Sequence, residues 1–236
     1  MLLLVQWRAM SDDTLNRWHA PRAVIWDVDG TLIDSGALHF EAWQEIMRAE
    51  AFDLTYAQFH ATFGQRNDGV LRAVLGPDLP DAEVERISRA KEALYRDLLR
   101  RRGIETLPGV REWLDHLHRT GWRQGIASSA PHANLEAIVE ILGLGAYFDA
   151  VVSGDDVTHG KPDPEIFLLA ARRLEVEPKR CVVIEDAPVG VEGARKAGMR
   201  SVGVLFAHDT LAADLVARSL ADLSPGVLEQ LVPEAV

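Results

Sequence analysis

Apolar and polar residues follow two different patterns along this chain, and the change falls just before its middle. Residues 37–102 carry apolar side chains at helical spacing, for example at Val84, Ile87, Leu94 and Leu98. Glycine and proline residues interrupt this region at intervals. The pattern predicts several helices and no strand.

Beyond that point, short apolar runs alternate with helical patterns. With one run near the N-terminus, the predicted strands are residues 24–26, 123–127, 150–152, 181–184 and 201–205. Strands that alternate with helices favour a parallel sheet covered by helices. The predicted fold class is therefore α/β.

The order of the two patterns predicts one domain interrupted by another. The first strand precedes the helical block and the other strands follow it, so residues 22–35 and 106–236 should form one domain. Residues 36–105 should form an inserted helical domain. Residues 1–21 are predicted to be a peripheral extension, within which Met10 is an alternative start of translation.

Composition narrows the class of partner. The net charge of −11 argues against nucleic acid or a membrane surface, so an anionic substrate must be attracted by local positive charge. Cys181 is the only cysteine, which allows no disulfide within one chain and suits the cytoplasm. The apolar part of the first ten residues is too short for a signal peptide or a membrane span. The oligomeric state cannot be predicted from the sequence, although a monomer is compatible with it.

The segment Val24–Ser35 (VIWDVDGTLIDS) carries the first candidate site. Asp27 and Asp29 follow a buried strand and, at positions i and i+2, share one face. Two carboxylates that close are electrostatically costly, so a cation or a shared proton is expected. Oxygen ligands favour a hard cation, most simply Mg²⁺. A strand followed by a common Asp-Gly turn is the alternative, but it does not explain Asp27.

Three later segments carry matching chemistry. Glu185 and Asp186 end another apolar run, although Asp186 alone could simply cap the helix predicted to begin at Pro188. Ser128 follows a strand, where a hydroxyl can either donate to a phosphate or cap a helix. Lys161 lies in the segment GKPDPE, where the alternative is a solvated loop lysine.

Together these four segments resemble the motifs of the haloacid dehalogenase (HAD) superfamily, most of whose members are Mg²⁺-dependent phosphohydrolases. The first motif of that family is a strand followed by D-x-D-G-T, and only Trp26, in place of the usual phenylalanine, departs from it. The resemblance covers residues 22 to about 220. It implies a Rossmann-like parallel sheet core with an inserted all-helical cap, as in the group of β-phosphoglucomutase and phosphoglycolate phosphatase.

The resemblance also implies a role for each residue. Asp27 would be the nucleophile and a metal ligand, Asp29 the general acid and base and a ligand through its carbonyl, and Lys161 the balancing cation. Asp186 would bind the metal directly, Glu185 directly or through a neighbour, and Ser128, rather than Ser129, the phosphate. A count of four carboxylates and a phosphate against Mg²⁺ and one lysine predicts a retained proton. We expect it on Asp29, because the like charge of Asp27 raises the pKa of Asp29.

Residues of the cap that face the core should contact the leaving group. The candidates are His39, Trp43, Arg66 and Asn67. His39 and Trp43 share a helix face, although Trp43 could equally pack inside the cap. A guanidinium at Arg66 suits a phosphate or a sugar hydroxyl, although most surface arginines are simply solvated.

Three functions fit these observations. The first is a Mg²⁺-dependent phosphatase that acts on a small phosphorylated metabolite, such as a sugar phosphate. The second is a phosphomutase of the β-phosphoglucomutase type, and the third is a catalytically silent binding protein. Dehalogenation is disfavoured by Asp29 and Asp186. Phosphonate cleavage would need a cap lysine, and the only one, Lys91, is expected to extend along the surface of its helix.

Overall fold

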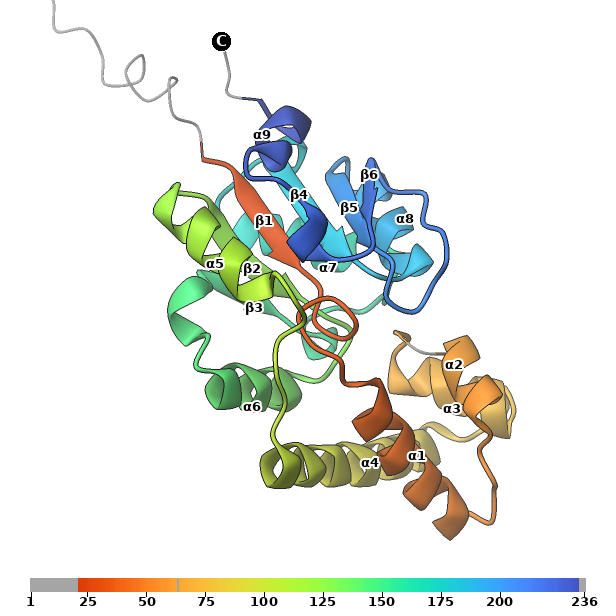
Figure 1. Ribbon diagram of the computed structural model, residues 1–236. Coiled ribbons are helices and arrows are strands. Elements are labelled where there is room, and N and C mark those ends of the chain that lie inside the picture. Colours follow the sequence, from red (N-terminus) through yellow and green to blue (C-terminus); the bar gives the residue numbers. More distant parts are fainter. Residues whose placement is uncertain (1–20, 63, 234–236) are drawn as a thin grey trace, which may run out of the picture.

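The core of the protein is a six-stranded parallel sheet (Figure 1). The computed structural model describes residues 21–62 and 64–233, so the predicted extension, apart from residue 21, lies outside the described residues, as does Met10. The strands are β1 (Ala23–Trp26), β2 (Arg123–Ala127), β3 (Ala150–Val152), β4 (Cys181–Glu185), β5 (Arg200–Val204) and β6 (Leu215–Ala217). Their order across the sheet is β3-β2-β1-β4-β5-β6.

The α/β prediction is confirmed, and the five predicted strands are present to within one residue at each end. The strand β6 was missed. Its three residues, LVA, are apolar, but so short a run does not distinguish a strand from part of a helix.

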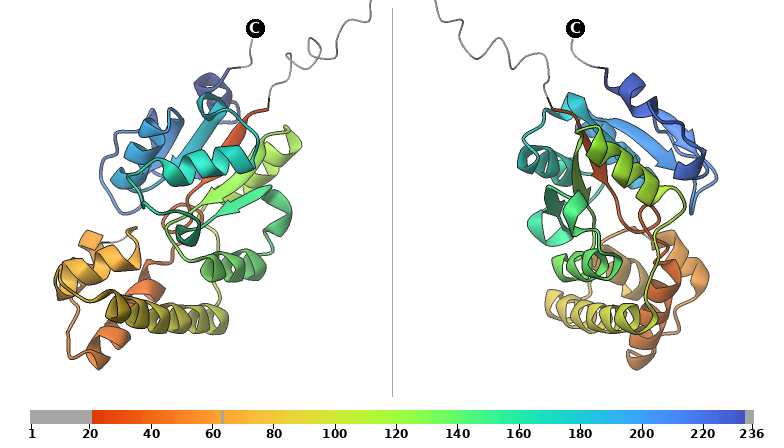
Figure 2. Two further views of the ribbon diagram at one scale, coloured as in Figure 1. Left: turned by 180° about the vertical axis from the view of Figure 1, so that it is seen from behind. Right: turned by 60° about the vertical axis from the view of Figure 1, so that its left-hand side comes forward.

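Helices cover both faces of the sheet, as the two views of Figure 2 show. Val24 and Trp26 of β1 belong to the apolar cluster that includes α5 (Val110–Arg119) and α6 (His132–Leu142). Ala23 and Ile25 belong to the cluster that includes α7 (Glu165–Arg173) and α8 (Pro188–Lys196). A strand buried on both faces explains the continuous apolar runs in the sequence. A short helix, α9 (Val227–Leu231), follows the last strand.

The predicted helical block forms a cap beyond the carboxyl ends of the strands (Figure 1). It contains α1 (Gly36–Ala49), α2 (Tyr56–Thr62), α3 (Asn67–Leu75) and α4 (Asp81–Arg102). An apolar cluster that includes Trp43, Met47 and Leu71 fills its interior. We keep residues 36–105 as the proposed extent of this domain.

The apolar stripe predicted along α4 contributes residues to two hydrophobic clusters, one in the cap and one in the core domain. Val84 and Ile87 pack inside the cap, whereas Leu98 belongs to the cluster that contains β1 and α5. The single long helix therefore joins the cap to the core. None of the helices in the described part of the chain is long and apolar enough to cross a membrane.

Candidate active site

Two strand ends meet where the strand order reverses. β1 pairs with β4, while β2 lies on the other side of β1, so the crevice that an open α/β sheet forms at its switch point lies at the ends of β1 and β4. Asp27 directly follows β1. Glu185 is the last residue of β4, and Asp186 directly follows it. The sheet therefore brings together carboxylates that are about 160 residues apart in sequence.

Gly30 allows this approach. Its φ of +88° lies in the region that favours glycine, and a Cβ atom at this position would overlap the Asp186 carboxylate. The Asp-Gly pair is thus more than a turn, because the glycine leaves space for a carboxylate from another strand.

Lys161 reaches the same strand ends. Its Nζ donates to Asp27 Oδ1 and to Glu185 Oε1, both at 2.6 Å, and its side chain is only 3% exposed. The alternative of a solvated loop lysine is therefore wrong. Beyond Lys161, Asp163 Oδ1 accepts a hydrogen bond from the N–H of Glu165, the first residue of α7.

The carboxylates Asp27, Glu185 and Asp186 form a buried acidic cluster. One oxygen of each lies within 4.8 Å of the others. Burial raises the pKa of Asp27 to about 8, against the attraction of Lys161, and burial with the charge of Glu185 raises the pKa of Asp186 to about 9. The cluster therefore holds protons in the absence of a cation.

The members of this cluster differ in their remaining contacts. Glu185 uses one oxygen for Lys161 and the other for the backbone N–H of Ala187. The Asp186 side chain makes no hydrogen bond within the described residues. Asp186 is therefore the carboxylate best placed to bind a cation directly, whereas Glu185 orients Lys161.

Asp29 points away from the acidic cluster, and its environment corrects one prediction. Its Oδ1 accepts a hydrogen bond from Ser35 Oγ and lies 3.3 Å from His39 Nε2. Burial opposes ionisation, but His39 and Ser35 outweigh it and lower the pKa of Asp29. The expected proton on Asp29 is therefore wrong for the protein without a ligand, and the raised pKa belongs to Asp27 and Asp186 instead.

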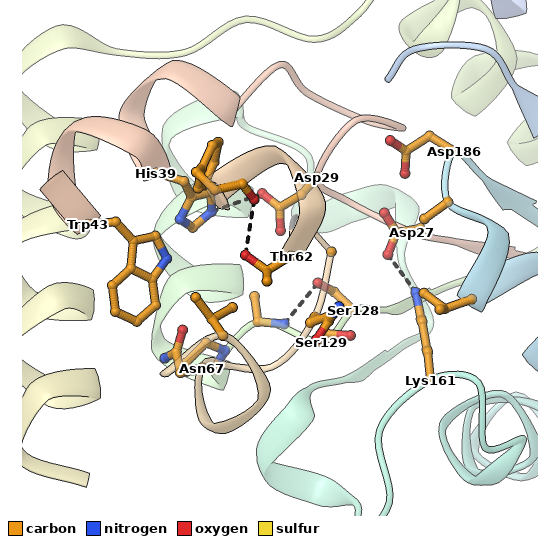
Figure 3. A pocket seen from close by; sticks show the side chains of 18 of the residues that line it. Asp27, Asp29, His39, Trp43, Thr62, Asn67, Ser128, Ser129, Lys161 and Asp186 are labelled. Carbon is orange, nitrogen blue, oxygen red and sulfur yellow. Dashed lines mark hydrogen bonds and ion pairs between the residues drawn. The ribbon is translucent and has the colours of Figure 1, made fainter. Parts of the chain in front are cut away.

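A cavity of about 60 Å³ connects the core residues to the cap (Figure 3). Asp27, Asp29, Lys161 and Asp186 line it on the core side. Ser128 and Ser129 both line it, and Ser128 Oγ accepts a hydrogen bond from Ala130 N at 3.1 Å.

Three of the four predicted cap residues line the same cavity. His39, Trp43 and Asn67 do so. Trp43 also belongs to the apolar cluster of the cap, so it packs inside the cap and lines the cavity as well. Figure 3 shows Trp43 and Asn67 across the cavity from Lys161. Arg66 is not among the lining residues, and its Nη1 donates to the carbonyl oxygen of Val157 at 3.2 Å. This arginine joins the cap to the core and does not line the cavity.

Lys91 corrects a further expectation. Its side chain is 3% exposed instead of extending to solvent, and its Nζ lies 2.8 Å from His39 Nδ1 and 2.7 Å from Glu92 Oε1. Burial lowers the pKa of Lys91, against the attraction of Glu92. One feature of the sequence agrees with this burial, because Lys91 shares a helix face with the aromatic Tyr95. In the structure His39 stacks on Tyr95 with ring centroids 3.9 Å apart.

Fold and site together define an enzyme with a Rossmann-like core and a helical cap. The chain belongs to the haloacid dehalogenase-like hydrolases, and the model of this hydrolase family matches residues 21–198.

The chain is similar in sequence and structure to several named enzymes. The chain is 35% identical over 184 residues to the fructose-1-phosphate phosphatase YqaB of Escherichia coli, covering 77% of this chain and 95% of that protein. It is 34% identical over 220 residues to the β-phosphoglucomutase of Bacillus subtilis, covering 89% and 94% of the two chains. Among solved structures, CbbY of Rhodobacter sphaeroides in complex with xylulose 1,5-bisphosphate has a TM-score of 0.79 and 27% identity, covering 86% and 96%.

Proposed function

We propose that this protein is a Mg²⁺-dependent phosphatase that hydrolyses a small phosphorylated metabolite through a phosphorylated aspartate. Membership of the hydrolase family and relatives named as phosphatases place it among the phosphoric monoester hydrolases. The observation that carries the mechanism is the contact of Asp27 with Lys161 at the end of β1, inside a cavity lined by a second acidic strand end.

The residues present fit a magnesium ion. Three carboxylates with close oxygens offer only hard ligands, and the raised pKa values of Asp27 and Asp186 show a cluster that is undercompensated by Lys161 alone. Asp27 and Asp186 would hold the ion. When bound, it would neutralise charge on the transferred phosphoryl group.

The remaining chemistry belongs to the chain itself. A carboxylate oxygen of Asp27 attacks phosphorus, and the bond from phosphorus to the leaving oxygen breaks. Lys161 and Ser128 donate to the phosphoryl oxygens, where negative charge accumulates. In the second step a water molecule attacks the phosphorus of phosphorylated Asp27, which releases inorganic phosphate and restores the carboxylate.

Asp29 would move the proton in both steps. It is ionised without a ligand, but a bound phosphate dianion raises its pKa because like charges disfavour the ionised form. Once protonated, Asp29 donates its proton to the leaving oxygen and then, as a base, takes one from the attacking water. Ser35 and His39 hold its carboxylate in position throughout.

The proposed function is tested by phosphate release from a panel of phosphorylated metabolites and p-nitrophenyl phosphate. We expect release that requires Mg²⁺ and stops when EDTA is added, because the acidic cluster needs a cation. Isomerisation of a sugar phosphate without phosphate release would instead indicate a phosphomutase, the activity named for the Bacillus subtilis relative. No turnover of any compound would favour a silent binding protein.

Stability should depend on pH in a direction set by the acidic cluster. The pKa values of Asp27 and Asp186 rise from 3.8 to about 8 and about 9 on folding, so the folded state binds more protons than the unfolded state between these limits. Without Mg²⁺, the melting temperature should therefore fall from about pH 5 to pH 9. Saturating Mg²⁺ should remove most of this fall, since the ion replaces the protons. A melting temperature with the same pH dependence in both conditions would contradict a cation site here.

A further inference from the structure

Glu92 is a buried cap carboxylate that has no part in the proposed chemical steps. It lies on α4, lines the catalytic cavity and is 5% exposed. Its position on the cap places it toward the leaving group, because Asp27 and Lys161 line the cavity from the core.

Three donors fix the orientation of this carboxylate. Asn67 Nδ2 and Lys91 Nζ donate to Oε1 at 2.8 and 2.7 Å, and Asn134 Nδ2 donates to Oε2 at 2.5 Å. The amide of Asn134 can face only this way, because its Oδ1 accepts a hydrogen bond from Arg96 Nη1 at 2.8 Å. Glu92 is therefore held rigidly by both the cap and the core.

One acceptor position of Glu92 remains available. A carboxylate has about four lone-pair positions, and the described residues occupy two on Oε1 and one on Oε2. Burial opposes ionisation, but the charges of Lys91 and His39 lower the pKa of Glu92, so it is an anionic acceptor. A hydroxyl group of a bound molecule could donate to it.

Each positively charged side chain that lines this cavity, among the residues that the structure describes, already faces a carboxylate. Among the described residues, the cap contributes two positively charged groups to the cavity: Lys91 pairs with Glu92, and His39 lies 3.3 Å from the Asp29 carboxylate. Lys161 is engaged by Asp27 and Glu185. Arg66 donates instead to core carbonyl groups outside the cavity.

We propose that Glu92 selects the leaving group. It accepts a hydrogen bond from a hydroxyl of a neutral, polyhydroxylated leaving group. By pairing with Lys91, it also keeps that ammonium from binding a second phosphate on the leaving group. This inference rests on the proposed phosphatase function. The CbbY complex shows that a related fold binds a bisphosphate, so exclusion would be a property of this chain's own cap.

The test compares kcat/KM for mannitol 1-phosphate, mannitol 1,6-bisphosphate and n-hexyl phosphate. For the wild type we expect the kcat/KM of mannitol 1-phosphate to exceed each of the others by at least about tenfold. The bisphosphate brings a second anion that meets only paired cations, and n-hexyl phosphate lacks the hydroxyl groups. In Glu92→Gln, the value for mannitol 1-phosphate should fall about 10- to 100-fold. Its advantage over the bisphosphate should shrink by at least about tenfold, because Lys91 is then free to attract an anion.

Glu83→Gln is the matched control. Glu83 lies on the same helix, pairs with the exposed Arg86 and lines no part of the cavity. Its substitution should therefore leave the kcat/KM values for all three compounds unchanged. Equal losses for all three substrates in Glu92→Gln would overturn the proposal, because a purely structural role acts on every substrate alike.

The wild type alone decides the question if Glu92→Gln does not fold. Equal kcat/KM values for the three wild-type reactions would overturn selection by Glu92 while leaving the phosphatase function intact. Absence of phosphate release even from p-nitrophenyl phosphate would overturn both proposals.

Discussion

Replacement of Asp27 by asparagine should reduce turnover by at least about 10,000-fold, because the amide cannot form the bond to phosphorus. The fold should survive. Burial already raises the pKa of Asp27 to about 8 in the absence of a cation, so a neutral side chain of the same shape resembles its state at pH 7. Phosphate release under saturating substrate, together with the circular dichroism spectrum and the melting temperature, checks both expectations.

Asp53→Asn provides the matched control, because Asp53 is an exposed carboxylate on the cap. It should retain the wild-type rate. An Asp27→Asn variant that kept more than a tenth of wild-type turnover would eliminate Asp27 as the nucleophile.

The second large effect is expected for Asp186→Asn, which removes the carboxylate that makes no hydrogen bond within the described residues. Turnover should fall by about 100-fold or more, and the added stability that Mg²⁺ gives the wild type should be lost. Asp186 is 3% exposed, and the pKa of its carboxyl is raised to about 9, so the neutral amide should not disrupt folding. Thermal melts with and without Mg²⁺ measure the effect separately from activity.

Asp97→Asn is the corresponding control, since Asp97 is exposed and pairs with Arg101 on its own helix. It should keep both the activity and the response to Mg²⁺. If Asp186→Asn were stabilised by Mg²⁺ as strongly as the wild type, the ion would bind elsewhere.

The sequence predicted the core of the site because the relevant residues lie at strand ends. In a parallel sheet the carboxyl ends of neighbouring strands share one edge, so runs ending in Asp27 and in Glu185-Asp186 must converge if their strands are adjacent. Lys161 could be placed by its motif, and the structure confirms that it contacts Asp27. The helical cap was predicted because its apolar residues recur at helical spacing.

What the sequence did not predict depends on distances between side chains. The proton was expected on Asp29 because Asp27 is near in sequence, yet contacts from Ser35 and His39 decide its ionisation. Lys91 was expected to extend toward solvent because it flanks the apolar stripe of its helix, and only the packing of α4 against α1 shows that it is buried.

Two further residues illustrate the same limit. Arg66 was expected in the cavity because it follows a loop glycine, but its guanidinium finds carbonyl acceptors in the core. Glu92 was not predicted to be a site residue, because a glutamate in a charged helix usually faces solvent. Its orientation depends in part on Asn134, which lies 42 residues further along the chain.

Detection of the phosphorylated enzyme is the most direct test of the mechanism. The wild type is mixed with Mg²⁺ and a ³²P-labelled substrate identified in the panel, quenched in acid within one turnover and digested for peptide mapping. The label should lie on the peptide containing Asp27, be released by hydroxylamine as an acyl phosphate is, and be absent from Asp27→Asn. Label on a different residue, or single-turnover release of phosphate without any labelled protein, would refute a phosphorylated Asp27.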